Sequence, residues 1–334
     1  PVAAALAYGR RGAPDEDIGV YDFGGWTFVF TALSIRKGTL RVLGAAGDAW
    51  LGGDDLDQAL AKSATDEFWK ETGINVRNRA AEWQRVVQAA EEAKCYLSMV
   101  NEIDLYVPDI AHTSEGPVEL SVEITRKRFG EVTADLVATT LSVAERGLGE
   151  SGLSTSTVGE VLLVGGSTRV PAVREAVENL FGRKPHATLH PEQAVVIGTA
   201  LRAAEIEGRE VHEGTWPGLT VVHAASHSVG LAMAGGATEP LVLRSTPLPA
   251  VARRTFSTFR DDQTELVLQI VEGESLSTEK NRTIGTFTIA GLPPRPAGEV
   301  DVEVIFEMNE SGALSVVALD LTTGRRTITK FELL

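Results

Sequence analysis

Two adjacent glycines between two strand-like runs most constrain how the N-terminal part of this chain can fold. Residues 18–23 and 27–34 are rich in apolar and β-branched side chains, so Gly24 and Gly25 are expected at a tight reversal between two strands. Backbone N–H groups in such a turn can point at an anion. We expect the ring of Trp26 to occupy the volume through which phosphate oxygens would approach the main chain. A hairpin with a purely structural role is the alternative.

A second glycine turn stands between a predicted strand and a predicted helix. Residues 161–164 form a short apolar run suited to a buried strand, and residues 172–181 show apolar side chains at helical spacing. The intervening residues 165–171 would place free N–H groups at the start of the helix, where its dipole favours phosphate or ribose oxygens. A plain connection between a strand and a helix is the alternative.

A predicted helix over residues 84–99 carries two different faces. Its apolar positions recur at helical spacing: Val86, Ala89, Ala90, Ala93 and Leu97. On a neighbouring face, Glu91, Lys94 and Ser98 fall together at steps of three and four residues. That face could meet an adenosine, whereas the alternative is a charged stripe in contact with water.

The sequence pattern changes from helical to strand-like after Gly208. The polar stretch 207–216 is typical of the end of a domain. In residues 266–271 and 300–305, one set of apolar side chains recurs at every second position, which predicts two-faced strands of an antiparallel sheet. These sets are Leu266, Leu268 and Ile270, and Val300, Val302 and Val304. Turn-forming residues at 309–312 and 322–324 separate the last strands, and residues 327–333 predict the final strand.

Composition excludes several classes of function. The chain has 334 residues, of which 43% are hydrophobic, enough for two or more domains with sizeable cores. A net charge of -15 argues against a nucleic-acid partner, because the phosphate backbone would repel it. No apolar run reaches the length of a membrane span, the start shows no signal-peptide pattern, and the single Cys95 excludes an internal disulfide. We expect a cytoplasmic protein with no membrane partner.

Taken in order, these segments resemble the DnaK-type seventy-kilodalton heat-shock chaperones. The similar motifs run nearly end to end, at residues 1–9, 22–28, 47–57, 90–94, 164–171 and 190–195 for the ATPase domain and at 256–258, 270–274 and 306–309 for the peptide-binding domain. The resemblance implies an incomplete α/β lobe of the actin-like ATPase fold, followed by an all-β antiparallel sandwich.

The same resemblance implies the domain boundaries. The lobe would cover residues 1–213, with its outer subdomain at about 54–147, and the sandwich would cover 226–334 without the helical lid of the family. An apolar linker at 214–225 would lie between them, with Leu219, Val221 and Val222 as its apolar residues. In the family this linker docks on the ATPase domain when ATP is bound, which couples the two sites. His223 stands where the family has an aspartate, so we expect weaker coupling.

Site residues follow by resemblance, position by position. Those implied for ATP or ADP with Mg²⁺ are Gly24, Gly25, Thr27, Glu91, Lys94, Ser98, Gly165, Gly166, Ser167 and Arg169. Thr27 and Asp22 are the catalytic candidates, and Asp22 could hold the metal through water rather than directly. The implied peptide cleft is lined by Leu231, Phe256, Leu266 and Leu268, with Ala234 and Phe259 arching over the bound backbone. Ordinary packing in the core of a sandwich is the alternative for the four lining residues.

Departures from the family pattern weaken the nucleotide site. Trp26 replaces a glycine of the phosphate turn, Val29 replaces an acidic residue, and Cys95 replaces an arginine that packs against the adenine. Glu192 and Gln193 replace an aspartate and a glutamate. The sequence also begins inside what resembles a family helix, so the first lobe would be missing, and we do not expect this chain alone to hydrolyse ATP.

Two classes of function remain open. The first is a chaperone that binds exposed apolar extended segments of unfolded proteins, ancestrally regulated by ATP and assisted by J-domain and nucleotide-exchange co-chaperones. The second is a non-enzymatic scaffold that stabilises one dedicated partner enzyme. A broad client spectrum released by Mg-ATP favours the first, and one stoichiometric partner favours the second.

Overall fold

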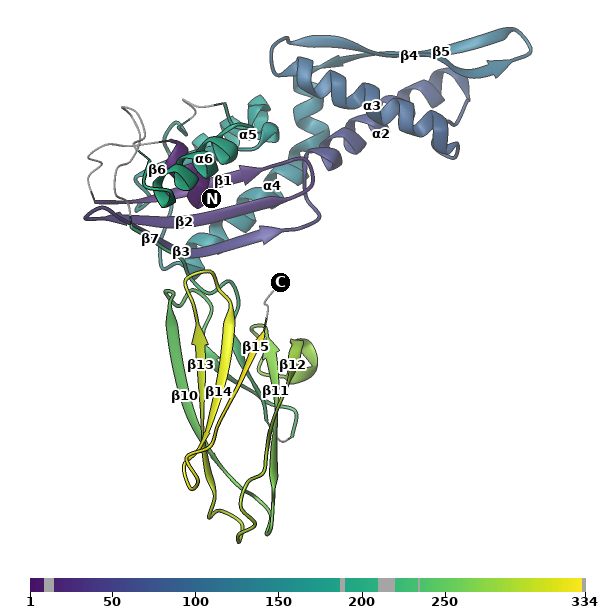
Figure 1. Ribbon diagram of the computed structural model, residues 1–334. Helices are drawn as coiled ribbons and strands as arrows, with labels where there is room; N and C mark the ends of the chain where they lie inside the picture. The colour runs from purple at the N-terminus through teal and green to yellow at the C-terminus, as the bar shows by residue number, and fades with distance from the viewer. Residues whose placement is uncertain (9–14, 187–189, 210–219, 234, 332–334) are drawn as a thin grey trace. The chain divides into compact units, whose positions relative to one another are not determined.

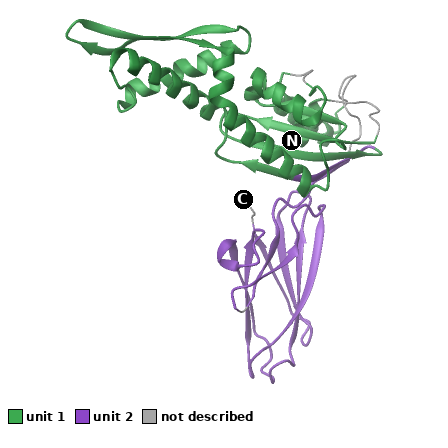
Figure 2. Ribbon diagram, turned by 180° about the vertical axis from the view of Figure 1, so that it is seen from behind, with its two compact units in different colours: residues 1–37, 45–219 green, residues 38–44, 220–334 purple. Residues whose placement is uncertain are grey.

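The computed structural model describes residues 1–8, 15–186, 190–209, 220–233 and 235–331 of the chain. The chain divides into two compact units, which Figure 2 shows in separate colours. Unit 1 comprises residues 1–37 and 45–219, and unit 2 comprises residues 38–44 and 220–334.

Unit 1 contains both helices and strands, and most of its strand pairs are antiparallel (Figure 1). Its helices are α1 (Val2–Ala7), α2 (Gly53–Thr72), α3 (Ala80–Leu97), α4 (Arg126–Glu150), the 3-10 turn η1 (Gly166–Arg169), α5 (Pro171–Phe181) and α6 (Ala194–Ile206). Its strands are β1 (Glu16–Phe23), β2 (Phe28–Arg36), β4 (Glu102–Thr113), β5 (Gly116–Thr125), β6 (Glu160–Val164) and the end of β3 (Thr39–Asp48).

The predicted hairpin and the second strand–turn–helix unit are both present. Strands β1 and β2 pair antiparallel from Glu16–Ile35 to Phe23–Phe28, so the turn falls on the two glycines as the sequence predicts. Strand β6 pairs parallel with β1 on its other side, which brings the turn before η1 next to the hairpin turn. The helices predicted at 84–99 and 172–181 are confirmed as α3 and α5.

Strands β6, β1 and β2 lie side by side in one sheet, and helices of unit 1 cover each of its faces. Tyr21 and Phe30 lie opposite each other in the β1–β2 ladder, and both are fully buried. The Tyr21 hydroxyl is hydrogen-bonded to Thr140 of α4, and a Cβ on Gly147 of α4 would lie 3.0 Å from the Phe30 ring. α4 therefore covers the face with Tyr21, while Ile18, on the opposite face, lines a small cavity together with residues of α1.

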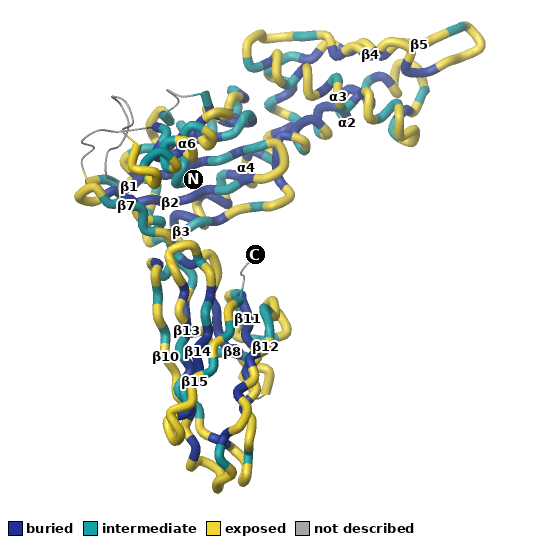
Figure 3. The backbone as a smooth tube through the Cα atoms, in the orientation of Figure 1, coloured by how far each residue is buried: buried dark blue, intermediate teal, exposed yellow. Residues whose placement is uncertain are grey.

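Helices α2, α3 and the start of α4 pack against the two-stranded ribbon of β4 and β5. One face of that ribbon is buried, whereas its alternate residues are exposed, as the alternating colours along both strands show (Figure 3). Its buried apolar residues are Leu105, Val107, Ile110, Ala111, Leu120, Val122 and Ile124. A two-stranded ribbon is marginal in water, so packing against the helices stabilises it.

Unit 2 contains two four-stranded antiparallel sheets. One has the order β10 (Ala250–Ser257), β13 (Asp301–Met308), β14 (Leu314–Asp320) and β15 (Arg326–Phe331). The other has the order β12 (Arg282–Ala290), β11 (Glu265–Glu272), β8 (Val229–Ala232) and β9 (Thr238–Val242), with the short turn η2 (Thr278–Lys280) before β12. Side chains from both sheets meet in one buried apolar cluster.

The predicted alternation along these strands is confirmed. In β11, Leu266, Leu268 and Ile270 are buried, while Val267 is exposed. The alternation ends at Val271, which is also buried, and at the same point the ladder with β12 shifts register, between Ile270 and Val271. Such a bulge places two residues opposite one, which sequence alternation does not reveal.

The apolar residues Val221 and Val222 lie in the short strand β7 (Thr220–Val222). This strand pairs parallel with residues 39–41 of β3, and both valines are partly buried. Leu219 lies outside the described residues. None of the helices in the described part of the chain is both long and apolar enough to cross a membrane.

Candidate functional site

Three glycine-containing segments of unit 1 converge at the hairpin turn. The N–H groups of Gly53 and Asp54, at the start of α2, donate to the carbonyls of Gly24 and Gly25 at 2.9 and 2.8 Å. Ser167, which follows β6, donates its hydroxyl to the same Gly24 carbonyl at 2.9 Å. The first N–H groups of a helix have no partner within it, so the hairpin turn satisfies two of those of α2.

No side chain could fit between these segments. A Cβ on Gly52 would lie 2.1 Å from the Gly25 carbonyl oxygen, and one on Gly165 would lie 2.3 Å from the Phe23 carbonyl oxygen. Gly165 also has a φ of +85°, which favours glycine. Gly52 and Gly53 are not among the site residues that the sequence predicts. The available signal is a Gly-Gly pair followed by two aspartates, a pattern typical of a helix start.

A cavity of about 490 Å³ opens beside this junction. Seven predicted nucleotide-binding residues line it, namely Gly25, Glu91, Lys94, Ser98, Gly166, Ser167 and Arg169. Cys95, Met99, Val170, Arg174 and Glu192 complete the lining. The structure therefore gathers the α3 face and the second glycine turn, far apart in sequence, around one space.

The remaining predicted nucleotide-site residues do not line this cavity. Gly24 donates its N–H to the Thr27 carbonyl at 3.0 Å, so the expectation that this amide points at an anion is wrong. The amide is used instead to close the hairpin. Thr27 is exposed, and Gly165 packs against the β1 backbone. Asp22 is half-buried, and burial raises the pKa of its carboxyl.

Trp26 does not fill the cavity. Its side chain is 77% exposed, and it is not among the residues that line the space. The hairpin turn docks on Gly52 through its backbone, which leaves the indole directed to solvent. The ring therefore does not occupy this cavity, and the expectation that it blocks the approach of phosphate oxygens to the main chain stays a prediction.

Lys94 forms a buried ion pair with Asp57 of α2. Its Nζ lies 2.7 Å from Asp57 Oδ2 and 3.2 Å from the Gly53 carbonyl oxygen, and the two side chains are only 12% and 4% exposed. Burial raises the pKa of Asp57 from 3.8 to about 6, against the opposing attraction of Lys94. The alternative of a charged stripe in water holds for exposed Glu91 but not for Lys94.

The other cavity cations also have partners. Arg169 lies 3.5 Å from Glu192, and Arg174 donates to the Thr168 carbonyl at 2.9 Å. Cys95 is exposed at the cavity wall, and partial burial raises the pKa of its thiol, which disfavours the reactive thiolate.

The predicted peptide-binding residues occupy two kinds of position. Leu231, Leu266 and Leu268 are 1, 8 and 7% exposed and belong to the buried cluster of unit 2, against which Phe256 also packs. This burial agrees with the core-packing alternative, so their part in a peptide cleft stays a prediction. Phe259 is 66% exposed and carries the Arg260 guanidinium 5.1 Å from its ring centre. Ala234 lies outside the described residues.

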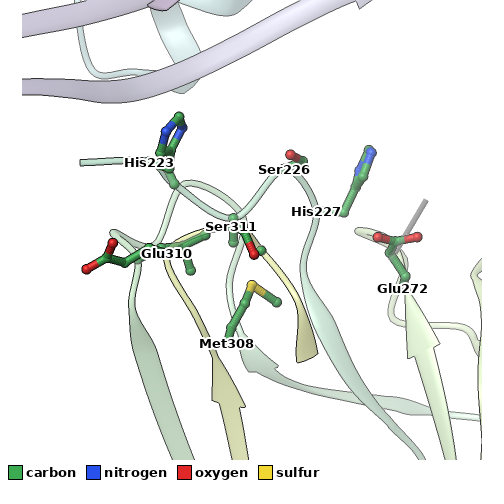
Figure 4. Close-up of a pocket in the computed structure, with 11 residues that line it drawn as sticks. His223, Ser226, His227, Glu272, Met308, Glu310 and Ser311 are labelled. Carbon is green, nitrogen blue, oxygen red and sulfur yellow. The ribbon is translucent and has the colours of Figure 1, made fainter. Parts of the chain in front are cut away.

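A second cavity, of about 280 Å³, lies within unit 2 (Figure 4). It is lined by His223, Ser226, His227, Leu248, Glu272, Met308, Glu310 and neighbouring small residues, and by none of the predicted peptide-binding residues. The Glu272 carboxylate is already paired with Arg282 at 2.6 Å, and the Glu310 side chain points away from it. This arrangement offers no clear preference for a ligand charge.

Substituting Gly52 with alanine should separate the hairpin turn from α2. Because the new methyl group would overlap the Gly25 carbonyl, Gly52→Ala should lower the free energy of unfolding of unit 1 by about 1–3 kcal/mol. All five tryptophans lie within residues 1–219, so tryptophan fluorescence during urea unfolding measures this unit. Gly149→Ala in α4, where a Cβ would meet nothing within 4 Å, is the control and should be neutral or stabilising. Equal effects of the two substitutions would contradict the packing argument.

The Asp57 pKa gives a stability dependence on pH with a definite sign. Because the folded protein binds this proton more tightly than the unfolded chain, the free energy of unfolding should fall as the pH rises from about 4 to about 6. Asp57→Asn should flatten this part of the profile, whereas Asp135→Asn, at an exposed position on α4, should leave it unchanged. Urea unfolding at several pH values measures it, and an unaltered slope in Asp57→Asn would refute the assignment.

Comparison with protein families agrees with this architecture and with the motif order. A model of the family described as Hsp70 protein matches residues 1–332, which is nearly the whole chain of 334 residues. The match spans both units and includes the hairpin turn, the α3 face and the second glycine turn. The resemblance to seventy-kilodalton heat-shock chaperones is thereby confirmed, and the chain belongs to the Hsp70 protein family.

Proposed function

We propose that this protein is a molecular chaperone whose unit 2 binds exposed, extended apolar segments of unfolded proteins and whose unit 1 binds the adenosine part of ATP or ADP. Family membership suggests the chaperone function and implies the actin-like ATPase fold for unit 1. The observation that carries the nucleotide half is the single cavity shared by the hairpin turn, α3 and the second glycine turn.

The cavity has the size and chemistry that a nucleoside requires. Its volume of about 490 Å³ falls in the usual range of small-molecule sites, roughly 300–1,000 Å³. Glu91 and Ser98 offer polar atoms for ribose hydroxyls, while Met99 and Val170 offer apolar surface for a base. Mg²⁺ would be carried mainly by the phosphates, as this ion usually is, and Asp22 is the candidate that would hold it through water.

For unit 2 the proposal rests on antiparallel strands beside an exposed aromatic residue. An extended peptide can gain affinity from backbone hydrogen bonds that do not depend on its sequence, and from one or two apolar side chains in pockets. Burial of each such side chain contributes roughly 1.5–3 kcal/mol. Among the described residues of the predicted cleft, Phe259 is the exposed one, so it can contact a peptide without first leaving the core.

Restoring an arginine at Cys95 should strengthen nucleotide binding. Cys95 is exposed at the cavity wall, and a guanidinium there could stack on the adenine, so Cys95→Arg should raise ADP affinity about three- to tenfold. Cys95→Lys adds the charge without the planar surface and should gain less. Isothermal titration calorimetry measures both variants. No detectable ADP binding to Cys95→Arg would count against a nucleotide role for the cavity.

Phe259 provides the cleanest test of peptide binding. Leu266→Asp would bury a carboxylate in the core and destabilise unit 2, whereas Phe259→Ala removes an exposed ring. We expect Phe259→Ala to weaken binding of a fluorescent leucine-rich heptapeptide about fivefold, measured by anisotropy, with an unchanged melting temperature. Val267→Ala, at a position 55% exposed, is the control and should bind normally. Equal binding by all three proteins would argue against the predicted cleft.

The scaffold alternative has a distinct outcome. If the protein stabilises one dedicated enzyme, purification from its native source should yield one stoichiometric partner that Mg-ATP does not release. Many substoichiometric clients, together with a J-domain or nucleotide-exchange protein, would instead support the chaperone proposal.

A further inference from the structure

The ion pair between Asp57 and Lys94 lies in the wall of the cavity rather than in its interior space. Asp57 is on the second turn of α2, and Lys94 is on the last turns of α3, where its side chain lines the cavity. The Lys94 ammonium is held between Asp57 Oδ2 at 2.7 Å and the Gly53 carbonyl oxygen at 3.2 Å. Both of these partners are on α2, so the contacts draw the ammonium toward that helix.

The Asp57–Lys94 ion pair is tightly packed, but not all of its polar atoms have hydrogen-bond partners. A Cβ on Gly53 would lie 3.1 Å from Lys94 Nζ and 2.6 Å from the Ser167 hydroxyl, so the junction has no spare volume on that side. Asp57 Oδ1 is buried and has no hydrogen-bond partner among the described residues. Keeping a buried carboxylate charged costs free energy when one of its oxygens has no hydrogen-bond partner. Protonation of Asp57 to its neutral form is therefore favoured more than in water.

The charge that a ligand meets depends on this pair. Arg169 is beside Glu192, and Arg174 is bound to the Thr168 carbonyl. While Lys94 is paired with Asp57, each cationic side chain in the described lining therefore already has a partner. Exposed Glu91 adds a negative charge at the same wall.

We propose that Asp57 decides whether this cavity can hold an anionic group: ionised Asp57 retains Lys94 in the wall, and neutral Asp57 releases the ammonium to the cavity. In the first state the cavity suits a neutral, hydroxyl-bearing group, and in the second it also accepts a phosphate or sulfate group. Asp57 is thus a specificity-determining residue that acts through Lys94. The inference rests on the proposed function only in treating the cavity as a ligand site.

The surroundings of Asp57 set the pH at which this change occurs. The charged or titratable groups that act on it are Lys94 and Glu91 of α3 and Asp54 of α2, and Cys95 of α3 also interacts with it. Burial raises the pKa of Asp57 to about 6, Lys94 opposes this rise, and Glu91 and Asp54 add to it. Release of Lys94 should therefore grow as the pH falls through about 6.

Sulfate is a suitable probe because its charge stays constant over the relevant pH range. Calorimetry on the whole protein measures its affinity for sulfate. This affinity should rise roughly five- to tenfold between about pH 7.5 and about pH 5, because the Lys94 ammonium is then released from one partly screened ion pair. Asp57→Asn should bind sulfate at about pH 7.5 as tightly as the unaltered protein does at about pH 5. The pH dependence that remains in Asp57→Asn measures the contribution of groups other than Asp57.

Glu91→Gln is the matched control, because it removes an acid from the same cavity without touching Lys94. If it raises sulfate affinity as much as Asp57→Asn does, the effect is general electrostatics and the proposal fails. A flat sulfate affinity in the unaltered protein, which requires no substitution, also overturns it. The probe contains no nucleoside, so failed ADP binding with the expected sulfate profile would refute the nucleotide proposal and leave this inference standing.

Discussion

The contact between the hairpin turn and the start of α2 holds the candidate site together. Carbonyl groups of Gly24 and Gly25 accept the N–H groups of Gly53 and Asp54, and the backbones meet so closely that position 52 admits no side chain. This contact fixes the first turn of α2, and with it Asp57 and the ammonium of Lys94. The glycines thus act through backbone packing and hydrogen bonding, not only through the space they leave for a ligand.

The charge that Lys94 brings to the cavity is controlled by a residue that does not line it. Asp57 is not among the lining residues, yet it determines how much of the Lys94 charge is available there. A helix face that displays a lysine therefore cannot be equated with a cationic binding surface. The relevant quantity is the balance between burial of the pair and its mutual attraction, which depends on neighbours from two helices.

Much of the fold follows from sequence patterns, and the departures have identifiable causes. The β1–β2 hairpin, the α3 and α5 helices and the alternation in β11 and β13 all agree with periodicity and turn chemistry, which depend on neighbouring residues. The bulge at Ile270 and Val271 was not predictable, because it depends on register with a partner strand. The exposure of the Trp26 side chain also does not follow from the sequence, because a residue's position in a turn does not determine where its side chain points.

The sequence by itself determined the family, the order of the elements and the residues of three segments that could meet at one site, since motifs and periodicity are local properties of the chain. Only the tertiary structure decided which of those residues share the cavity, that the Gly24 amide closes the hairpin, and that Lys94 is paired with Asp57. Asp57 and Lys94 are far apart in the sequence, and whether two such groups pair in a buried place depends on how separate helices pack.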